Sequence, residues 1–355
     1  MYSHTKNSQR QLGNVAISRF ANALATKFDN AGNLVCQNDG VDGCVPANIF
    51  GLGNLSQEAA DYLGIGATNL ESYTTQVASL AVTNGNLFDF GAGGVGIAFG
   101  VEYRSEQGRN DPDTFLASGD VVGFNSGLPT SGSYHVREFF GEVNIPLLRD
   151  NIVHSLELNG AARQSKYSNS VGNVFTWSAG ATLAPIEDIA LRGQYQKAVR
   201  GPSVSELFLG QTISFAGNAD FCGTDAAIPA GPLRDICVAQ FTAAGAPLGS
   251  IGNPSIQDPD VVNPFTNVGG NSALREETAK TYTFGAIIKP RFMPRFSATV
   301  DYYNIKVTNL VGPVGTQGIG RACFLGSAQE FCNSIVRNSL GQIDSFDDFN
   351  RNTGG

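Results

Sequence analysis

The polar residues best suited to chemistry in this chain recur at alternating positions of several segments. They are Glu138, Glu142, Glu157, Arg163, Arg192 and Gln194, followed by Gln196. Carboxylate and guanidinium groups form charge-assisted hydrogen bonds, so this set could bind a polar ligand or a second protein. The same groups could instead pair with one another and stiffen the wall that carries them. The sequence leaves these two interpretations open.

Residues suited to catalysis or nucleotide binding are sparse. The three histidines, His4, His135 and His154, are scattered, and no G-x-S-x-G segment occurs. The stretch Gly91-Ala92-Gly93-Gly94-Val95-Gly96 matches G-x-G-x-x-G, but it opens a strand pattern where a dinucleotide site requires a helix. We interpret it as a turn, and we expect neither an enzyme nor a bound cofactor.

Two acidic pairs could supply oxygen ligands to calcium. Asp111 and Asp113 flank Pro112, and Asp258 and Asp260 flank Pro259. Surface turns explain both pairs more simply, so we do not assign a metal site.

The elements that carry the polar set alternate between apolar and polar residues. Such segments cover 95–104, 136–146, 153–166, 172–184, 189–199, 280–290 and 295–305, preceded by a less regular strand over 73–89. The connections are short at 91–94, 147–152, 185–188 and 290–294, and long at 105–133, 200–278 and 307–340; the tip at 167–171 is a short exception. Short turns at one rim and long loops at the other are typical of outer-membrane β-barrels. We therefore predict an all-β antiparallel transmembrane barrel segment of about 8–10 long strands, with extracellular loops that contain short helices.

Composition agrees with this fold class. Charged residues make up only 15% of the chain, whereas 43 glycines and 23 phenylalanines are present. Mean hydropathy is −0.07, as expected when a lipid-facing and a polar face average out. The net charge of −8 argues against nucleic acid as a partner.

The six cysteines form three pairs that are local in sequence, and this favours the disulfides Cys36–Cys44, Cys222–Cys237 and Cys323–Cys332. All three fall on the long-loop side, where thiols stay oxidised. A structural zinc site is the alternative, but no C-x-x-C and no neighbouring histidine supports it.

Residues 1–72 show little strand alternation, and we interpret them as a large extracellular loop region. Apolar spacing predicts helices over 15–26 and 56–64, with Ser56 as N-cap and Gly64 as the end of the second. A separate small domain is the alternative. The strands and loops of the barrel then occupy 73–355.

No apolar signal region opens the chain, and it ends at Asn352-Thr353-Gly354-Gly355 without a strand end. We expect a piece of a longer exported protein. Eight strands, with a ninth plausible after Ile343, would leave two unpaired edges. We therefore expect this chain alone to form an open, curved sheet.

Two segments resemble motifs of the TonB-dependent outer-membrane receptors. The first is similar to the R-A-P-x-x-x-E-L-[FY] box through Arg200, Pro202 and Glu206, with Gly201 in place of Ala. The second is similar to the N-P-x-L-x-x-E-[ST] box through Asn271, Leu274 and Glu277, with Ser272 in place of Pro. Residues 140–148 also resemble a strand and turn of the larger members, so the likeness covers about 70–350.

The resemblance implies a 22-stranded barrel in the outer membrane of a Gram-negative cell. It implies an N-terminal plug that contacts the TonB complex, and import of a scarce, bulky ligand. Neither the plug, its TonB box nor the C-terminal strands can be recognised in this chain. Siderophores, glycans, cobalamin and peptides stay open as ligands, whereas haem is disfavoured because no histidine follows residue 154. A passive porin-type channel and a secreted β-rich adhesin or lectin are the alternatives.

Overall fold

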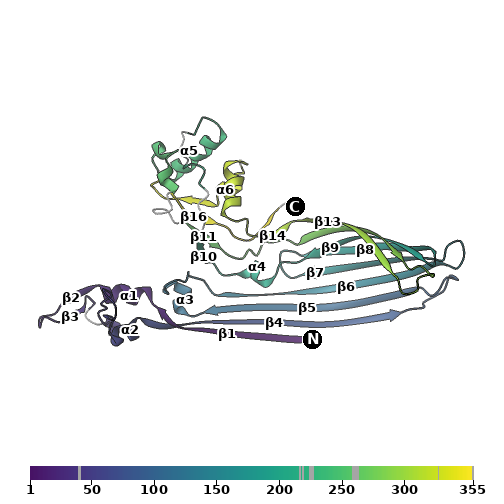
Figure 1. Cartoon of the computed structure of the whole chain (residues 1–355), viewed down its shortest axis with the longest axis horizontal. Coiled ribbons are helices and arrows are strands. Elements are labelled where there is room, and N and C mark those ends of the chain that lie inside the picture. Colours follow the sequence, from purple (N-terminus) through teal and green to yellow (C-terminus); the bar gives the residue numbers. More distant parts are fainter. Residues whose placement is uncertain are drawn as a thin grey trace.

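A computed structural model describes residues 1–38, 41–215, 217, 220–223, 228–257, 264–326 and 328–353. Nine antiparallel strands form one long curved sheet (Figure 1). In sheet order they are β1 (Tyr2–Val15), β4 (Gly64–Asn84), β5 (Gly96–Pro112), β6 (Thr130–Arg149), β7 (Ser155–Tyr167), β8 (Asn173–Ile186), β9 (Ile189–Arg200), β12 (Glu277–Ile288) and β13 (Ala298–Thr308). Within the described residues, β1 and β13 are the two edges and do not pair with each other. The open sheet expected from the strand count is confirmed.

The N-terminal segment corrects the sequence interpretation. Residues 2–15 are not loop but an edge strand, and β4 begins at Gly64, nine residues before the predicted position. Polar side chains occupy both faces of β1, so no alternation revealed it; its pairing with β4 makes it a strand. The prediction of a ninth barrel strand after Ile343 is wrong, because those residues form the short β16 (Ile343–Asp347) of another sheet. The ninth strand of the long sheet is β1, at the start of the chain.

Strand alternation gives the long sheet two chemically distinct faces. In β6, Val136 and Glu138 are buried, whereas Arg137 and Phe139 point the other way and are exposed. We call the face that carries Glu138 the polar face and its opposite the apolar face. Residues directly opposite one another on neighbouring strands share a face, so the apolar face continues across the sheet. It carries exposed aromatic and aliphatic side chains. These include Phe99, Phe139, Trp177, Leu191, Phe284 and Tyr302.

The segment between β1 and β4 contains both predicted helices. They are α1 (Ile17–Leu24) and α2 (Gln57–Leu63), and the hairpin β2 (Thr26–Phe28) and β3 (Leu34–Cys36) and the 3-10 helix Val41–Gly43 lie between them. The Ser56 hydroxyl accepts a hydrogen bond from the Ala59 amide at 3.1 Å, so Ser56 is the N-cap that the sequence predicted. A further short helix, α3 (Thr114–Ser118), lies between β5 and β6, where both strands extend into the predicted loop 105–133.

Residues from the two remaining long loops fold together into what we call the loop cap. It contains β10 (Thr212–Phe215), α5 (Pro232–Ala244), the 3-10 helices Leu248–Ser250 and Pro254–Gln257, β11 (Phe265–Val268), β14 (Leu310–Gly312), α6 (Thr316–Phe324), α7 (Gln329–Cys332), β15 (Ile335–Arg337), β16 and β17 (Arg351–Thr353). A four-stranded sheet in the order β10-β11-β16-β15 carries α5 and α6, which stand at one end of the long sheet in Figure 1. Its core is buried around Phe241, Phe324 and Phe346. A loop region with a core of its own is held in one shape.

All three predicted disulfides are present, and each lies on the long-loop side of the sheet. Two of them, Cys222–Cys237 and Cys323–Cys332, belong to the core of the loop cap. Among the described residues no helix has both the length and the apolarity needed to cross a membrane.

Candidate ligand recess and loop anchor

The six predicted polar residues line two neighbouring recesses of the polar face. Glu138, Glu142 and Arg163 border a recess of about 390 Å³. Glu157, Arg192 and Gln194 border a second recess of about 740 Å³. Gln196 lines both, so strands β6, β7 and β9 bring the whole set to one continuous surface.

Glu138 is held in place within the wall. Its carboxylate accepts hydrogen bonds from Arg163 Nη1 at 2.9 Å and from Ser165 Oγ at 2.5 Å, and the residue is only 6% exposed. The Arg163 guanidinium also lies over the Phe140 ring, 4.9 Å from its centroid. Glu138 and Arg163 therefore pair with each other, and a stiffening role for this pair remains a prediction.

Arg192 is likewise engaged, with a partner that sequence analysis missed. Its Nε and Nη2 donate to the two carboxylate oxygens of Asp301 at 3.0 and 2.7 Å, across the register of β9, β12 and β13. The signal was available, because Asp301 alternates with the apolar Val300 and Tyr302 in the recognised segment 295–305.

The other three members of the set remain available to a ligand. Within the described part of the chain, the side chains of Glu142, Glu157 and Gln194 take part in no protein hydrogen bond or ion pair, although each lines a recess. The polar set therefore divides into groups that pair within the wall and unpaired groups that face open space. Contact of the unpaired groups with a plug or ligand remains a prediction.

Further polar residues at the loop end of this face were missed. The Arg104 guanidinium lies 3.5 Å from the Glu106 carboxylate, and the Tyr73 hydroxyl donates to Glu106 at 2.5 Å. Tyr134 and Tyr167 lie nearby with ring centroids 6.4 Å apart. Alternation places Arg104 and Glu106 on the polar face, but their segment lay in or beside a predicted loop.

At the loop rim, one arginine joins three elements, and we call this group the rim anchor. Arg200, the last residue of β9, donates from Nε and Nη2 to Glu277 of β12 at 2.8 and 2.7 Å. It also donates from Nη1 and Nη2 to Glu206 of α4 (Val204–Phe208) at 2.9 and 3.0 Å. The long excursion between β9 and β12 is thereby closed at its base.

Local sequence places Glu206 for this contact. The Ser203 hydroxyl accepts from the Glu206 amide, and the Glu206 carboxylate accepts from the Ser203 amide at 2.7 Å, which is a capping box. Partial burial acts to raise the pKa of Glu206, but hydrogen bonds from Arg200 and Ser203 outweigh it, so the net shift of this pKa is downward. The carboxylate therefore stays charged at neutral pH.

The second family-like box meets the first at this point. The Asn271 amide donates to the Glu206 carbonyl at 2.9 Å, and Leu274 is 1% exposed beneath α4 with Val204 and Leu207. Pro202 is fully buried as well. All six predicted box residues thus converge, and what they form is a structural joint at the base of the loop cap.

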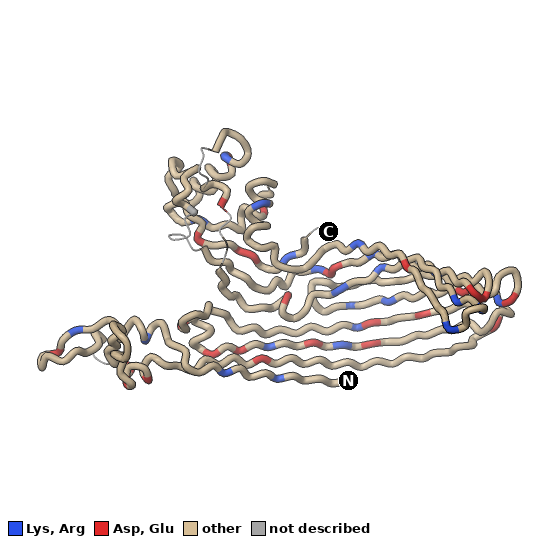
Figure 2. Tube along the Cα trace, in the orientation of Figure 1, with Lys and Arg blue, Asp and Glu red and all other residues tan. Residues whose placement is uncertain are grey.

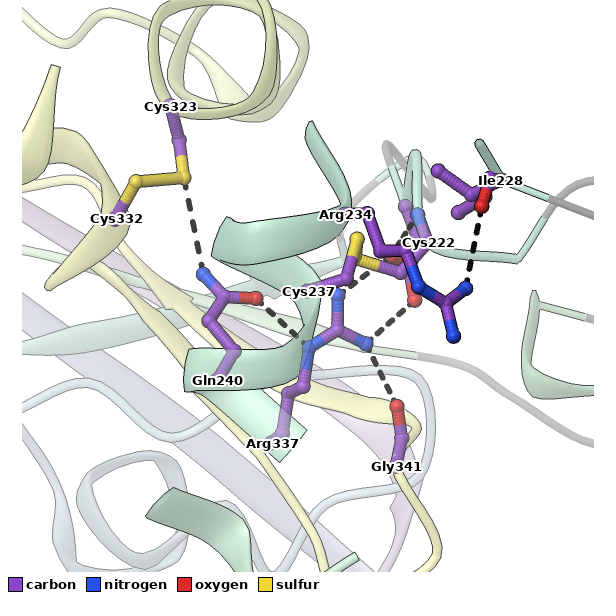
Figure 3. Close-up of a disulfide and its surroundings, with 10 residues drawn as sticks. Cys222, Ile228, Arg234, Cys237, Gln240, Cys323, Cys332, Arg337 and Gly341 are labelled. Atoms are coloured by element: carbon purple, nitrogen blue, oxygen red, sulfur yellow. Dashed lines mark hydrogen bonds and ion pairs between the residues drawn. A yellow bond between two sulfur atoms is a disulfide. The ribbon is translucent and has the colours of Figure 1, made fainter. Parts of the chain in front are cut away.

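The loop cap contains a buried ion pair that sequence analysis did not identify. Arg337 Nη2 lies 2.6 Å from Asp220 Oδ1, with side chains 1% and 0% exposed. Figure 3 shows how Arg337 also donates to Gln240 and to the Gly341 carbonyl, between the two disulfides. The two partners are 117 residues apart in loops without periodicity, so no sequence signal connects them.

The acidic pairs considered for calcium serve other roles where they are described. Asp113 caps α3 and also accepts from the Thr68 amide at 2.6 Å, and Asp111 pairs with Arg109 at 2.5 Å. The segment Asp258–Asp260 lies outside the described residues. Elsewhere in the described ranges, no three acidic, histidine or cysteine side chains gather as a metal site would require.

Several solved receptor structures share similarity with the chain. A mutant of the ferric enterobactin receptor PfeA from Pseudomonas aeruginosa matches with 14% identity and a TM-score of 0.47, over 99% of this chain and 36% of that one. The siderophore receptor PirA from Acinetobacter baumannii matches with 10% identity and a TM-score of 0.44, over 99% and 37%. A double mutant of the Serratia marcescens hemophore receptor HasR, in complex with hemophore and heme, matches with 12% identity and a TM-score of 0.40, over 70% and 37%. The chain thus spans little more than a third of the length of each of these receptors.

No curated protein matches the chain. The family model for the β-barrel of TonB-dependent receptor-like proteins matches residues 3–350, almost the whole chain. It includes both boxes of the rim anchor and every strand of the long sheet. The chain therefore belongs to the family of TonB-dependent receptor β-barrels.

Proposed function

We propose that this chain is the part of an outer-membrane receptor that captures a bulky polar ligand, which the whole receptor then imports with energy supplied through TonB. Family membership supports an outer-membrane receptor or transporter. The capture step, the ligand class and the energy source are our proposals.

The observation that carries the proposal is the set of unpaired polar groups on the polar face. Glu142, Glu157 and Gln194 line recesses, and their side chains have no protein partner among the described residues. Glu142 is exposed and Glu157 and Gln194 are partly exposed, so their polar atoms are accessible to a ligand from outside the chain. Two carboxylates and an amide accept hydrogen bonds from hydroxyl and amine groups, which siderophores, glycans, cobalamin and peptides all carry.

The loop cap supports capture because it is shaped before any ligand arrives. Its own core, its two disulfides and the buried Arg337–Asp220 pair hold its form. A preorganised surface loses less conformational entropy on binding than a flexible loop does. We propose that the loop cap closes on ligand above the recesses, with the rim anchor as its fixed base.

Haem stays disfavoured in this proposal. Histidine is a common iron ligand, and the chain has none after His154. The loop cap, which follows residue 154, therefore contains no histidine that could bind haem iron.

Uptake by living cells tests the proposal. A strain that lacks the gene is complemented with the natural full-length protein and given labelled ferric siderophore, cobalamin, oligosaccharide or peptide, one at a time. We expect saturable accumulation of one of these, lost when TonB is deleted or a protonophore is added. Non-saturable uptake that needs neither would indicate a passive porin, and surface binding without accumulation would indicate an adhesin.

A double variant and a control test whether the recesses bind the ligand. Glu142→Gln combined with Glu157→Gln is expected to raise the half-saturation concentration for uptake at least tenfold, since each lost charge-assisted hydrogen bond is worth about 1.5–3 kcal/mol. Glu58→Gln, an exposed carboxylate in α2, is the control and should leave uptake unchanged. Equal uptake by the double variant and the control would remove the recess from the proposal.

A further inference from the structure

Three lysines lie side by side on the apolar face, near the loop ends of β9, β12 and β13. Lys197 is directly opposite Lys280, and Lys280 is directly opposite Lys306. Neighbouring strands are about 4.8 Å apart, so the three Cα atoms lie within about 10 Å. We call these residues the lysine row.

The chain offers the lysine row no counter-charge. Like charges that face one another across strands are destabilising. From β6 to β13 the apolar face has no Asp or Glu at any of its strand positions, and none of the three lysines forms an ion pair within the described residues. An anion bound at this surface would therefore offset the repulsion between the three lysines.

The opposite face of the same strands shows that pairing is otherwise the rule. The arginines of the polar face, Arg163, Arg192 and Arg200, each contact a carboxylate. Figure 2 shows acidic and basic positions interspersed along these strands. From β6 to β13 the strand positions with Glu or Asp thus lie on the polar face, whereas the charged strand positions of the apolar face are basic.

The height of the lysine row places it at the border of the apolar band. Each lysine lies eight residues from the turn end of its strand, at Ile189, Ile288 and Ala298 respectively. Eight residues span about 26 Å along a strand, or about 20 Å of height at the usual barrel tilt, and the apolar band of such barrels is about 25 Å tall.

Aromatic rings mark the same border. Trp177 and Tyr195 have centroids 5.3 Å apart, Tyr195 is opposite Tyr282, and Tyr282 and Tyr302 have centroids 6.4 Å apart. Trp and Tyr rings concentrate at the level of lipid headgroups. Trp177 is directly opposite Lys197, and the lysine row lies beyond the three tyrosines, toward the loops.

We propose that the lysine row binds the phosphate groups of an anionic lipid in the leaflet on the loop side of the membrane. An ammonium on a long flexible stem can lie against apolar surface while its charge reaches the headgroup layer. Three such charges within about 10 Å match a phosphate-bearing headgroup in sign and in spacing. The proposal concerns bound lipid and is independent of which ligand the receptor imports.

Native mass spectrometry of the natural full-length receptor tests the proposal. The protein is released from micelles that contain phosphatidylglycerol or, in a parallel sample, zwitterionic phosphatidylcholine. We expect phosphatidylglycerol to be retained far better than phosphatidylcholine. Each lysine near an anionic lipid surface contributes a modest attraction, so replacing all three (Lys197→Gln, Lys280→Gln and Lys306→Gln) should weaken retention on the order of 100-fold.

Two further variants make the result decisive. The triple Lys→Arg variant keeps the charge and should retain the lipid, whereas Lys280→Gln alone should give an intermediate loss. Lys27→Gln, Arg234→Gln and Arg321→Gln together remove the same charge from the loops and should leave retention unchanged. Equal retention of the two lipids by the wild-type protein, or wild-type retention by the triple Gln variant, would overturn the proposal.

Discussion

Replacing Arg200 by Gln should release the base of the loop cap without unfolding the long sheet. Arg200 makes four hydrogen bonds to Glu206 and Glu277, and no other residue joins β9, β12 and α4 in this way within the described chain. Its loss also leaves two carboxylates facing each other with no cation between them. We expect α4 to detach from the rim more often.

The size of the effect follows from exposure. The side chain of Arg200 is 46% exposed, whereas those of Glu206 and Glu277 are 23% and 15% exposed. Charge-assisted hydrogen bonds contribute about 1.5–3 kcal/mol each when shielded, and exposed ion pairs contribute under about 1 kcal/mol. We count one contribution of about 1.5 kcal/mol for each of the two carboxylates that Arg200 contacts, which gives about 3 kcal/mol. This free energy corresponds to about a 100-fold increase in local opening.

Hydrogen exchange read by mass spectrometry measures this opening directly. The amides of Leu207, Leu209 and Asn271 donate to carbonyls within the joint, so peptides over 203–211 and 270–278 should exchange about 100-fold faster in Arg200→Gln. Arg192→Gln breaks a comparable two-bond pair elsewhere on the polar face and is the matched control. Unchanged exchange in Arg200→Gln, or equal acceleration in both variants, would refute the role of the rim anchor.

Three other outcomes follow from the same contacts. The pKa of Glu206 is shifted downward from its ordinary value of 4.5. The stability that Glu206 gives the rim anchor is therefore complete above pH 4.5 and is lost as the pH falls through the lower pKa of the folded state. Hydrogen exchange of the same peptides, corrected for intrinsic rates, should stay slow at pH 4.5 and become faster only at lower pH. Gly270→Ala would place a Cβ 2.5 Å from the Leu209 backbone nitrogen, and this overpacking should cost about 1–3 kcal/mol and accelerate exchange of the same peptides. Asp220→Asn leaves the buried Arg337 guanidinium without its counter-charge and should destabilise the loop cap by about 3–5 kcal/mol, seen as faster proteolysis of the cap. Combining Asp220→Leu with Arg337→Met should restore much of the resistance, and a double variant as labile as Asp220→Asn would contradict the charge explanation.

Patterns that belong to a single strand could be predicted from sequence. The strands within 95–199 and 280–305 alternate because one face of each strand contacts apolar surroundings and the other contacts polar groups. Consecutive residues of the sequence therefore alternate between apolar and polar, and this pattern can be recognised without a structure. The disulfides were predictable for a related reason, since each closes a short loop. The N-terminal strand was missed because β1 is polar on both sides and lacks that contrast.

Sequence by itself therefore determined eight of the nine strands of the long sheet, their two faces, the three disulfides and seven of the polar residues that line the recesses. Only the tertiary structure decided which charges pair, because partners such as Arg192 and Asp301 are 109 residues apart and meet through strand register. It also brought Asn271 against Glu206, and Lys197 beside Lys280 and Lys306. Alternation records which side of a strand a residue occupies, whereas register between distant strands determines its neighbours, and that depends on the whole sheet.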